Sequence, residues 1–316
     1  DVDAIHMDDY FYPYPAAGQA FPDDKSFRRY GLAKGYKPSQ RADWRRENVN
    51  LLIRELKRTI LLTKPWVRFG ISPFGIYRNK KSTPDGTGSN TNGLQNYDDL
   101  YADILYWINQ GWIDYNIPQI YWEIGHPAAD YITLIKWWSK NAGNVPLYIG
   151  QDVARTMKVD QLTEKMRYER NLPAIQGNCF WPANELLWNN RGVADSLKTH
   201  YHRYPALIPA YTHLHDRAPK EVKGLKAEWT PDGYILRWKA EQSKTNPELA
   251  SYFVVYRFAN KEKVDLNNPA HIVAITRDTH YKLPYKDGKV KYRYVVTSVD
   301  RFHNESKKGK SKKVKL

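Results

Sequence analysis

The feature that most constrains the fold is an order that the sequence repeats five times: a short apolar run, a loop and a stretch with helical spacing. The runs predict strands at residues 2–7, 67–72, 117–125, 146–151 and 174–181, and the stretches predict helices at 43–63, 97–110, 128–140, 159–169 and 193–201. Strands joined by helical crossovers form a parallel sheet. We therefore expect an α/β domain over residues 1–205, with a long binding loop at 14–42.

The pattern changes at a proline-bearing connector, residues 206–218, and becomes all strand over residues 219–316. Strands are predicted at 222–229, 233–238, 251–258, 271–276, 290–300 and the basic end, with turns at 231–233 and 286–288. Short strands at this spacing indicate an antiparallel sandwich. The segments 225–238, 252–257 (YFVVYR) and 292–300 (YRYVVTSVD) resemble a fibronectin type III module.

The net charge and the cysteine content of the chain limit the kinds of function that it can have. The net charge is +15, and residues 217–316 carry most of it, with 23 Lys and Arg against 11 Asp and Glu. The basic tip at 307–315 could track a polyanion, but we expect a solvated terminal strand and no nucleic acid partner. The single cysteine, Cys179, excludes an internal disulfide framework and is expected in the core. No stretch approaches the roughly 18 apolar residues of a membrane span.

The first strand ends in two adjacent carboxylates, Asp8 and Asp9, followed by aromatic residues. In parallel α/β folds, ligands bind at the carboxyl ends of the strands, so these groups stand where chemistry on a sugar or a metal is expected. The chain also has 11 Trp and 24 Tyr, whose flat faces suit sugar rings.

Five motifs in order make residues 1–205 similar to the bacterial glycosyl-hydrolase-like ten family: 2–13 (VDAIHMDDYFYP), 70–77 (GISPFGIY), 118–122 (PQIYW), 147–150 (LYIG) and 177–181 (GNCFW). The resemblance implies a TIM-type β/α barrel of which this chain holds strands four to eight. Because a full barrel takes roughly 250 residues, we expect a fragment or processed chain of a larger protein. It further implies a glycosidase that acts on peptidoglycan strands without peptides, at the periplasm, the cell surface or in the medium.

Two catalytic arrangements are open. In the preferred one, Asp8 orients the substrate's own 2-acetamido group as the nucleophile and Asp9 is the general acid, or the two roles are exchanged. Like charges this close raise one of the two pKa values, as an acid catalyst requires. This arrangement fails if Asp9 faces the helices, because strand neighbours point to opposite faces. In the second, Glu123 pairs with Asp8 or Asp9 across the barrel mouth, retaining at about 5 to 5.5 Å and inverting at about 6.5 to 9.5 Å.

The strand ends also supply groups expected to bind the polysaccharide substrate: Tyr10, Tyr12, Ser72, Tyr77, Arg78, Gln119, Tyr121, Trp122, His126, Gln151 and Trp181. No cofactor is expected. One alternative is a metal-assisted hydrolase, because the first strand carries Asp1, Asp3, His6, Asp8 and Asp9. Another is a barrel that binds glycan without cleaving it.

Overall fold

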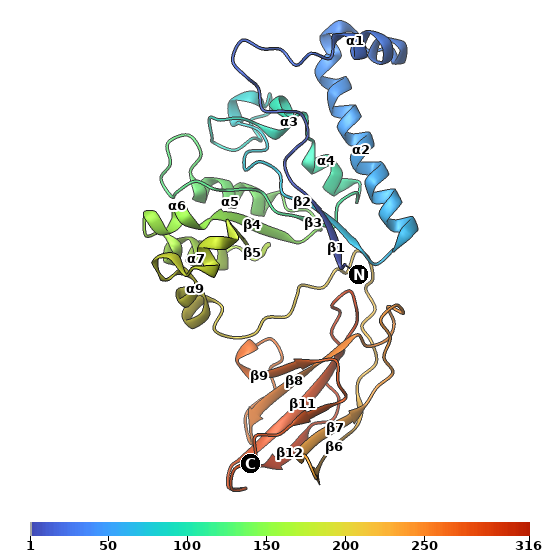
Figure 1. The fold of residues 1–316 in the computed structure, drawn as a ribbon, viewed down its shortest axis with the longest axis vertical. Helices are drawn as coiled ribbons and strands as arrows, with labels where there is room; N and C mark the ends of the chain where they lie inside the picture. The colour runs from blue at the N-terminus through green and yellow to red at the C-terminus, as the bar shows by residue number, and fades with distance from the viewer. Residues whose placement is uncertain (1) are drawn as a thin grey trace. The chain divides into compact units, whose positions relative to one another are not determined.

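The computed structural model describes residues 2–316. The chain divides into two compact units, Asp1–Ser196 (unit 1) and Leu197–Leu316 (unit 2) (Figure 1). The expected connector belongs to unit 2, where the backbone N–H of Tyr211 donates to the carbonyl of Phe302 and Leu207 packs against a cluster on the sandwich. No helix within residues 2–316 is long and apolar enough to span a bilayer.

Unit 1 contains the expected parallel sheet, with five strands side by side in chain order. They are β1 Ala4–Met7, β2 Arg68–Ile71, β3 Tyr115–Asn116, β4 Leu147–Asp152 and β5 Ile175–Trp181. β3 lies just before the strand predicted at 117–125, which is therefore misplaced; the regular ladder ends ahead of Pro118, which has no N–H to donate. Beyond it, Gln119 alone bridges Phe74 on one side and Gly150 on the other.

The helices differ more from the prediction than the strands do. They are α1 Asp24–Ser26, α2 Arg41–Thr63, α3 Asn96–Asp99, α4 Ile104–Asn109, α5 Tyr131–Lys140, α6 Val153–Lys158, α7 Leu162–Arg170, α8 Ala183–Leu187 and α9 Val193–Ser196. A single helix at 97–110 is wrong: Tyr101 has a positive φ of 55°, and Asp103 caps a new helix by accepting from the N–H of Tyr106. Short helical turns between Asp24 and Gln40 occupy much of the expected binding loop. The helix expected at 193–201 continues past α9 as a π-helical turn, Leu197–Tyr201.

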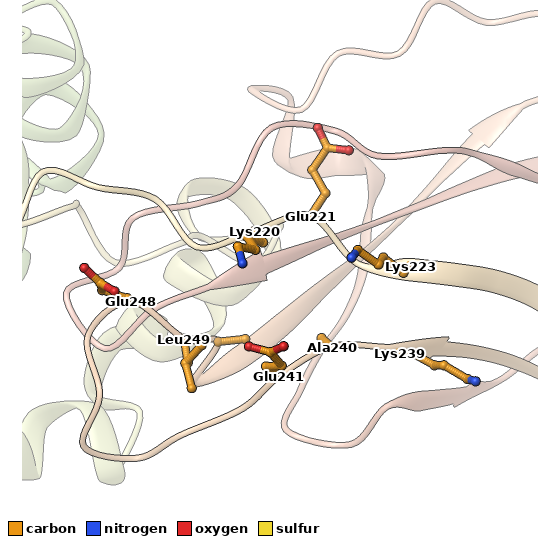
Figure 2. A pocket seen from close by; sticks show the side chains of 9 residues that line it. Lys220, Glu221, Lys223, Lys239, Ala240, Glu241, Glu248 and Leu249 are labelled. Carbon is orange, nitrogen blue, oxygen red and sulfur yellow. The ribbon is translucent and has the colours of Figure 1, made fainter.

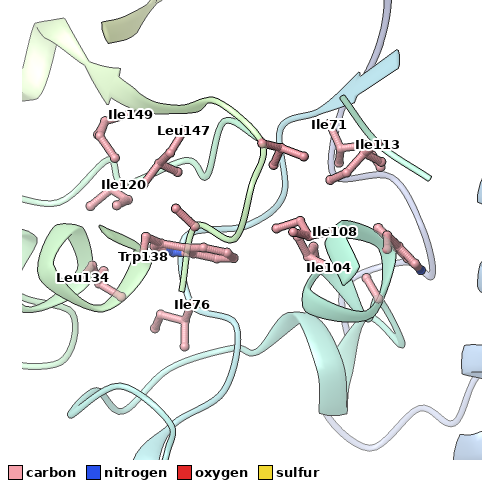
Figure 3. Packing of buried hydrophobic residues seen from close by; sticks show 14 of the residues in the cluster. Ile71, Ile76, Ile104, Ile108, Ile113, Ile120, Leu134, Trp138, Leu147 and Ile149 are labelled. Carbon is pink, nitrogen blue, oxygen red and sulfur yellow. The ribbon is translucent and has the colours of Figure 1, made fainter. Parts of the chain in front are cut away.

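The main core of unit 1 lies between one face of the sheet and helices α4 and α5 (Figure 3). Strand residues meet helix residues there, all of them fully or almost fully buried: Ile71, Leu147 and Ile149 from the sheet, Ile104 and Ile108 from α4, and Leu134 and Trp138 from α5. Burying one such side chain contributes about 1.5–3 kcal/mol. The indole N–H of Trp138 also donates to the carbonyl of Gly75 at 2.7 Å, so this buried polar atom is satisfied.

Unit 2 is a sandwich of two antiparallel sheets that resembles a fibronectin type III module. One has the order β10-β7-β6 and the other β12-β11-β8-β9. The strands are β6 Lys223–Thr230, β7 Gly233–Lys239, β8 Tyr252–Ala259, β9 Ile272–Thr276, β10 His280–Lys282, β11 Lys291–Val299 and β12 Lys312–Lys315. β10 was not predicted, since three residues are too few to show an alternation. Leu236 and Trp238 meet Phe253, Val255 and Tyr294 between the sheets.

Candidate active site

The pleat of β1 sends alternate side chains to opposite faces of the sheet. Met7 pairs in register with Ile71 and packs against the core on the helix side. His6 pairs with Gly70, and its Nδ1 lies 3.1 Å from the hydroxyl of Tyr115 on the other face. We name this second face, lined by His6 and Tyr115, the open face of the sheet.

Asp8 is exposed at the end of β1, and its carboxylate is held by two donors. The side-chain amide Nε2 of Gln119 donates to Oδ1 of Asp8 at 2.6 Å, and the backbone N–H of Asp9 donates to the same oxygen at 2.9 Å. The amide of Gln119 also donates to the carbonyl of Ser72 at 2.9 Å. Gln119 therefore ties the ends of β1 and β2 together and orients the carboxylate. Ser72 contributes its backbone oxygen to this network and is itself buried.

Asp9 is 5% exposed, and its Oδ2 accepts a hydrogen bond from the hydroxyl of Tyr14. Burial raises the pKa of Asp9 above its ordinary value; the bond from Tyr14 opposes this shift, and the charge of Asp8 adds to it. Within residues 2–316 no hydrogen bond joins this carboxylate to a helix. Asp9 instead lines a cavity of about 440 Å³ with the loop that follows it, residues 10–14.

Aromatic rings surround the two carboxylates. Tyr121 stacks on the half-exposed Trp181 with ring centroids 5.6 Å apart. Burial and the nearby charge of Asp8 raise the pKa of Tyr121, so its hydroxyl remains a proton donor. Phe74 lies edge-on to Tyr14 and to Trp122, at 6.0 and 5.4 Å. Neither Tyr14 nor Phe74 was among the expected site residues, although both lie in or next to the family motifs.

Three expected binding residues lie on the loops, and two of them, Tyr12 and His126, have structural partners. Tyr10 is 78% exposed and lines the cavity beside Asp9. Tyr12 also lines that cavity and packs edge-on against Phe21 and Tyr101, at 5.1 and 5.0 Å. The Nδ1 atom of His126 accepts from the backbone of residues 128 and 129, which organises the turn before α5.

Gln151, Tyr77 and Arg78 are not brought to the Asp8–Asp9 edge. Gln151 is fully buried, because its position on β4 points it to the helix side. Tyr77 donates to Asp103 at 2.8 Å, and Arg78 makes two bonds to Asp98 at 2.8 and 2.9 Å. Tyr77 and Arg78 line a separate cavity of about 360 Å³ beside α5.

Glu123 is connected to the helices. Its backbone carbonyl accepts from the N–H of Tyr131 at 3.4 Å, and its charge partly offsets the lowering by burial of the pKa of Lys165 on α7. The carbonyl of Trp122, one residue earlier, accepts from the Nζ of Lys165 at 2.9 Å. The turn that carries Tyr121, Trp122 and Glu123 is thus anchored from beneath by α7.

A buried polar cluster forms this anchor, and sequence reasoning missed it. The carboxylate of Glu169 accepts from Tyr131, from Gln151 at 2.8 Å and from Asn178 at 2.7 Å. Burial raises the pKa of Glu169 to about 7 and lowers that of Lys165 to about 8. Lys165 and Glu169 stand four residues apart on one helix, a spacing that is typical of solvated surface pairs, so the sequence carries no signal of their burial.

Two further expectations concern the position of Cys179 and a possible metal site. Cys179, expected in the core, is exposed: it pairs with Gly150, while its neighbour Asn178 points to α7. Within residues 2–316 no three His, Cys, Asp or Glu side chains gather as metal ligands. Asp1, a member of the proposed metal set, lies outside the described residues.

The chain is similar to several known proteins. The chain is 41% identical to the glycosyl hydrolase YngK of Bacillus subtilis over 98% of its own length, and spans 62% of that relative. It is 43% identical to the glycosyl hydrolase DigH of Escherichia coli over 47% of this chain and 33% of the relative. The solved chitinase ChiA74 from Bacillus thuringiensis aligns with 99% of this chain and 58% of its own at 13% identity, with a TM-score of 0.35. An Fn3-like protein from Clostridium thermocellum aligns with 31% of this chain and 92% of its own at 24% identity, with a TM-score of 0.22.

The profile of one family, described as glycosyl hydrolase-like 10, matches residues 1–166. This match covers more than half of the chain, and the identity to YngK extends over nearly all of it. The chain belongs to the glycosyl hydrolase-like 10 family.

Proposed function

We propose that unit 1 carries the catalytic edge of a glycoside hydrolase that acts on a glycan with 2-acetamido groups, such as bacterial cell-wall strands. One observation carries the proposal: two adjacent carboxylates stand in different environments at the end of β1. Asp8 is exposed and held by the amide of Gln119, while Asp9 is buried and has a raised pKa. In glycosidases, the acid and base roles usually rest on environments that give two neighbouring carboxyl groups different pKa values.

In the proposed mechanism, Asp9 carries the proton that is donated, and Asp8 orients the acetamido group of the substrate. Protonated Asp9 donates to the glycosidic oxygen as the bond from that oxygen to the anomeric carbon breaks. The carbonyl oxygen of the substrate's acetamido group, whose N–H is held by Asp8, forms the new bond to the anomeric carbon. Water then opens the cyclic intermediate while ionised Asp9 takes its proton, which restores both groups. Substrate-assisted glycosidases of this kind are an established exception to the two-carboxylate scheme.

The aromatic residues fit a sugar-binding role around this edge. The stacked pair Tyr121 and Trp181 presents a half-exposed indole, and Tyr10 exposes most of its ring beside Asp9. Flat apolar faces cover the CH faces of sugar rings, while the Gln119 amide and tyrosine hydroxyls bond to polar groups. A wall glycan as substrate implies that the protein works outside the cytoplasm.

We also propose that the sheet of unit 1 is five consecutive β/α units of a TIM-type barrel. The support is that all five strands are parallel and neighbours in chain order, as barrel strands are. In a structure of the full-length protein, β1 and β5 would then each pair with a further strand. A full-length structure in which either remains a free edge would contradict this.

The test of function is turnover by the full-length protein on peptide-free peptidoglycan strands and on chitin-type oligomers. Asp8→Asn and Asp9→Asn should each lower the rate by about 100-fold or more, the usual contribution of a positioned acid or base. Asp3→Asn is the matched control, an exposed carboxylate just before the same strand. Absence of saccharide release by the folded parent on both substrates would favour a barrel that only binds glycan.

The second catalytic arrangement is tested with Glu123→Gln. The substrate-assisted scheme predicts near-normal turnover for this variant, because Glu123 interacts with α5 and α7. A loss as large as that of Asp9→Asn would instead support a pair of carboxylates across the mouth.

A further inference from the structure

Unit 2 has a groove of about 740 Å³ on the side where strand β6, at the edge of one sheet, meets β12, at the edge of the other. Aromatic side chains from the β6–β7 hairpin and the loop before β11 line it, together with lysines of β11 and β12. This combination of aromatic rings and lysines distinguishes the groove from the other cavities described here and from the Asp8–Asp9 edge in unit 1.

The aromatic part of the groove is a preformed platform. The ring of Trp229 stacks on Tyr234, its cross-strand partner, at 4.9 Å and 21° between ring planes. Tyr285 packs edge-on against Trp229 at 4.8 Å. Even so, Trp229 is 62% exposed and Tyr285 43% exposed. An indole held by two tyrosines but left open to solvent is a rigid apolar surface of the kind that marks binding sites.

The lysine part of the groove carries charge that the fold does not neutralise. Lys291 and Lys315 lie directly opposite each other on β11 and β12, and Lys312 and Lys313 also line the groove. Like charges directly opposite on paired strands destabilise a sheet. Within residues 2–316 none of these four lysines forms an ion pair with a carboxylate, and the acid that lines the groove, Asp287, is paired with Lys289 at 3.0 Å.

A second cavity of unit 2 differs from the groove in the charges that line it (Figure 2). It has a volume of about 300 Å³ and also contains a cross-strand lysine pair, Lys223 and Lys239. A third lysine, Lys220, and three glutamates, Glu221, Glu241 and Glu248, line it with them, so the cavity contains as many carboxylates as ammonium groups. The groove beside Trp229 lacks such a balance among the described residues, and an anionic ligand would supply it.

We propose that the groove lined by Trp229 and Lys291 binds an acidic glycan, with a sugar ring on the indole and its carboxylate or phosphate groups beside the lysines. Ammonium groups act as point charges that need no fixed fork geometry, so a chain of repeating anionic sugars can be held in several registers. The choice of a glycan over another polyanion rests on the proposed function of unit 1. The basic end of the chain is then part of a binding site: β12 is ordered by its pairing with β11 and presents its lysines to the ligand.

The experiment measures binding by the full-length protein carrying Asp8→Asn, which prevents hydrolysis during titration. The probes are peptide-free peptidoglycan strands with carboxylates, a phosphate-bearing wall polymer, neutral chitin-type oligomers of equal length, and single-stranded DNA. Trp229→Ala should weaken binding of the acidic glycans by about tenfold, the effect of losing one aromatic anchor. Lys291→Gln with Lys315→Gln should weaken binding of the acidic strands, reduce its salt dependence and leave the neutral oligomers unaffected.

Two matched controls accompany these variants. Trp188→Ala removes an indole of unit 1 that is 68% exposed, and Lys223→Gln with Lys239→Gln removes the balanced lysine pair. Both should bind like the parent, and thermal unfolding checks that all variants are folded. Unchanged affinity in the Trp229 and Lys291/Lys315 variants, or tighter binding of DNA than of every glycan, would overturn the proposal. Because the readout is binding, failure of hydrolysis by unit 1 would leave this result interpretable.

Discussion

The side-chain amide of Gln119 donates to the carboxylate of Asp8 at 2.6 Å, although the two residues are 111 positions apart in the chain. The same amide nitrogen bonds to the carbonyl of Ser72. The orientation of Asp8 is therefore set by the parallel alignment of β1, β2 and the residues after β3, and it depends on the whole sheet.

Replacing Gln119 tests this positioning role. Gln119→Glu puts a second carboxylate where the amide donates to Asp8, so a hydrogen bond is replaced by charge repulsion and the orientation of Asp8 should loosen. We expect turnover to fall by about tenfold or more, mainly through a lower kcat. Gln176→Glu, at an exposed position on β5, should leave turnover unchanged. A Gln119→Glu enzyme with parental kcat and pH profile would show that the amide does not position Asp8.

The bond from Tyr14 should tune the acid. It lowers the pKa of Asp9, so Tyr14→Phe should raise that pKa further. A general acid works only while protonated, and activity falls as pH rises through its pKa. The alkaline limb of the rate profile should therefore move to higher pH in Tyr14→Phe and stay in place in Tyr10→Phe, whose ring is 78% exposed. A shift of this limb to lower pH would contradict the acid role of Asp9.

The cluster around Glu169 predicts how the stability of unit 1 depends on pH. The pKa of Glu169 is raised from 4.5 to about 7, so between these values the folded state binds more protons than the unfolded state. The free energy of unfolding should then fall as pH rises from about 4.5 to about 7, by roughly 3 kcal/mol in total. Lys165, lowered from 10.5 to about 8, acts in the opposite direction: stability should rise as pH increases from about 8 to about 10.5.

Hydrogen exchange of the amides of α7 and β4 measures this dependence within unit 1. Glu169→Gln should flatten the fall between about pH 5 and about pH 7. Glu164→Gln, on the same helix and about half exposed, should retain it. Equal slopes for the parent and Glu169→Gln would show that another group is responsible.

A buried ion pair beneath β2 offers a test of the scaffold. The Nζ of Lys57 lies 2.6 Å from both carboxylate oxygens of Asp114, which also accepts from the N–H of Phe69 at 2.7 Å. Lys57→Met removes this ammonium group from a buried carboxylate and should cost about 3–5 kcal/mol of stability. Arg58→Gln, on the exposed side of α2, should cost less than about 1 kcal/mol.

A second substitution identifies the cause. Adding Asp114→Asn to Lys57→Met removes the carboxylate charge and keeps an acceptor for the N–H of Phe69. Chemical denaturation should show that the double variant regains part of the lost stability. If the double variant is less stable than Lys57→Met alone, the penalty arises from packing and not from an uncompensated charge.

The sequence by itself determined the class and order of the elements. Alternating apolar runs and helical spacing predicted the parallel sheet, and turn residues such as Pro231 to Gly233 predicted the hairpins of unit 2. These features depend on residues close together in the chain, so a local pattern is enough to reveal them. The pair Asp8 and Asp9 at a strand end was visible for the same reason, although its catalytic role stays a prediction.

Only the tertiary structure decided which side chains meet. Gln151 ends a predicted strand much as Ser72 does, yet the register of β4 turns it toward Glu169 on the helix side, away from Asp8. Cys179 reads as a core residue, yet the alternation of β5 leaves it on the open face. The face that a strand residue occupies and the burial of Lys165 and Glu169 depend on contacts between distant segments. Such contacts form when the sheet and helices pack, and a one-residue change of register would reverse them.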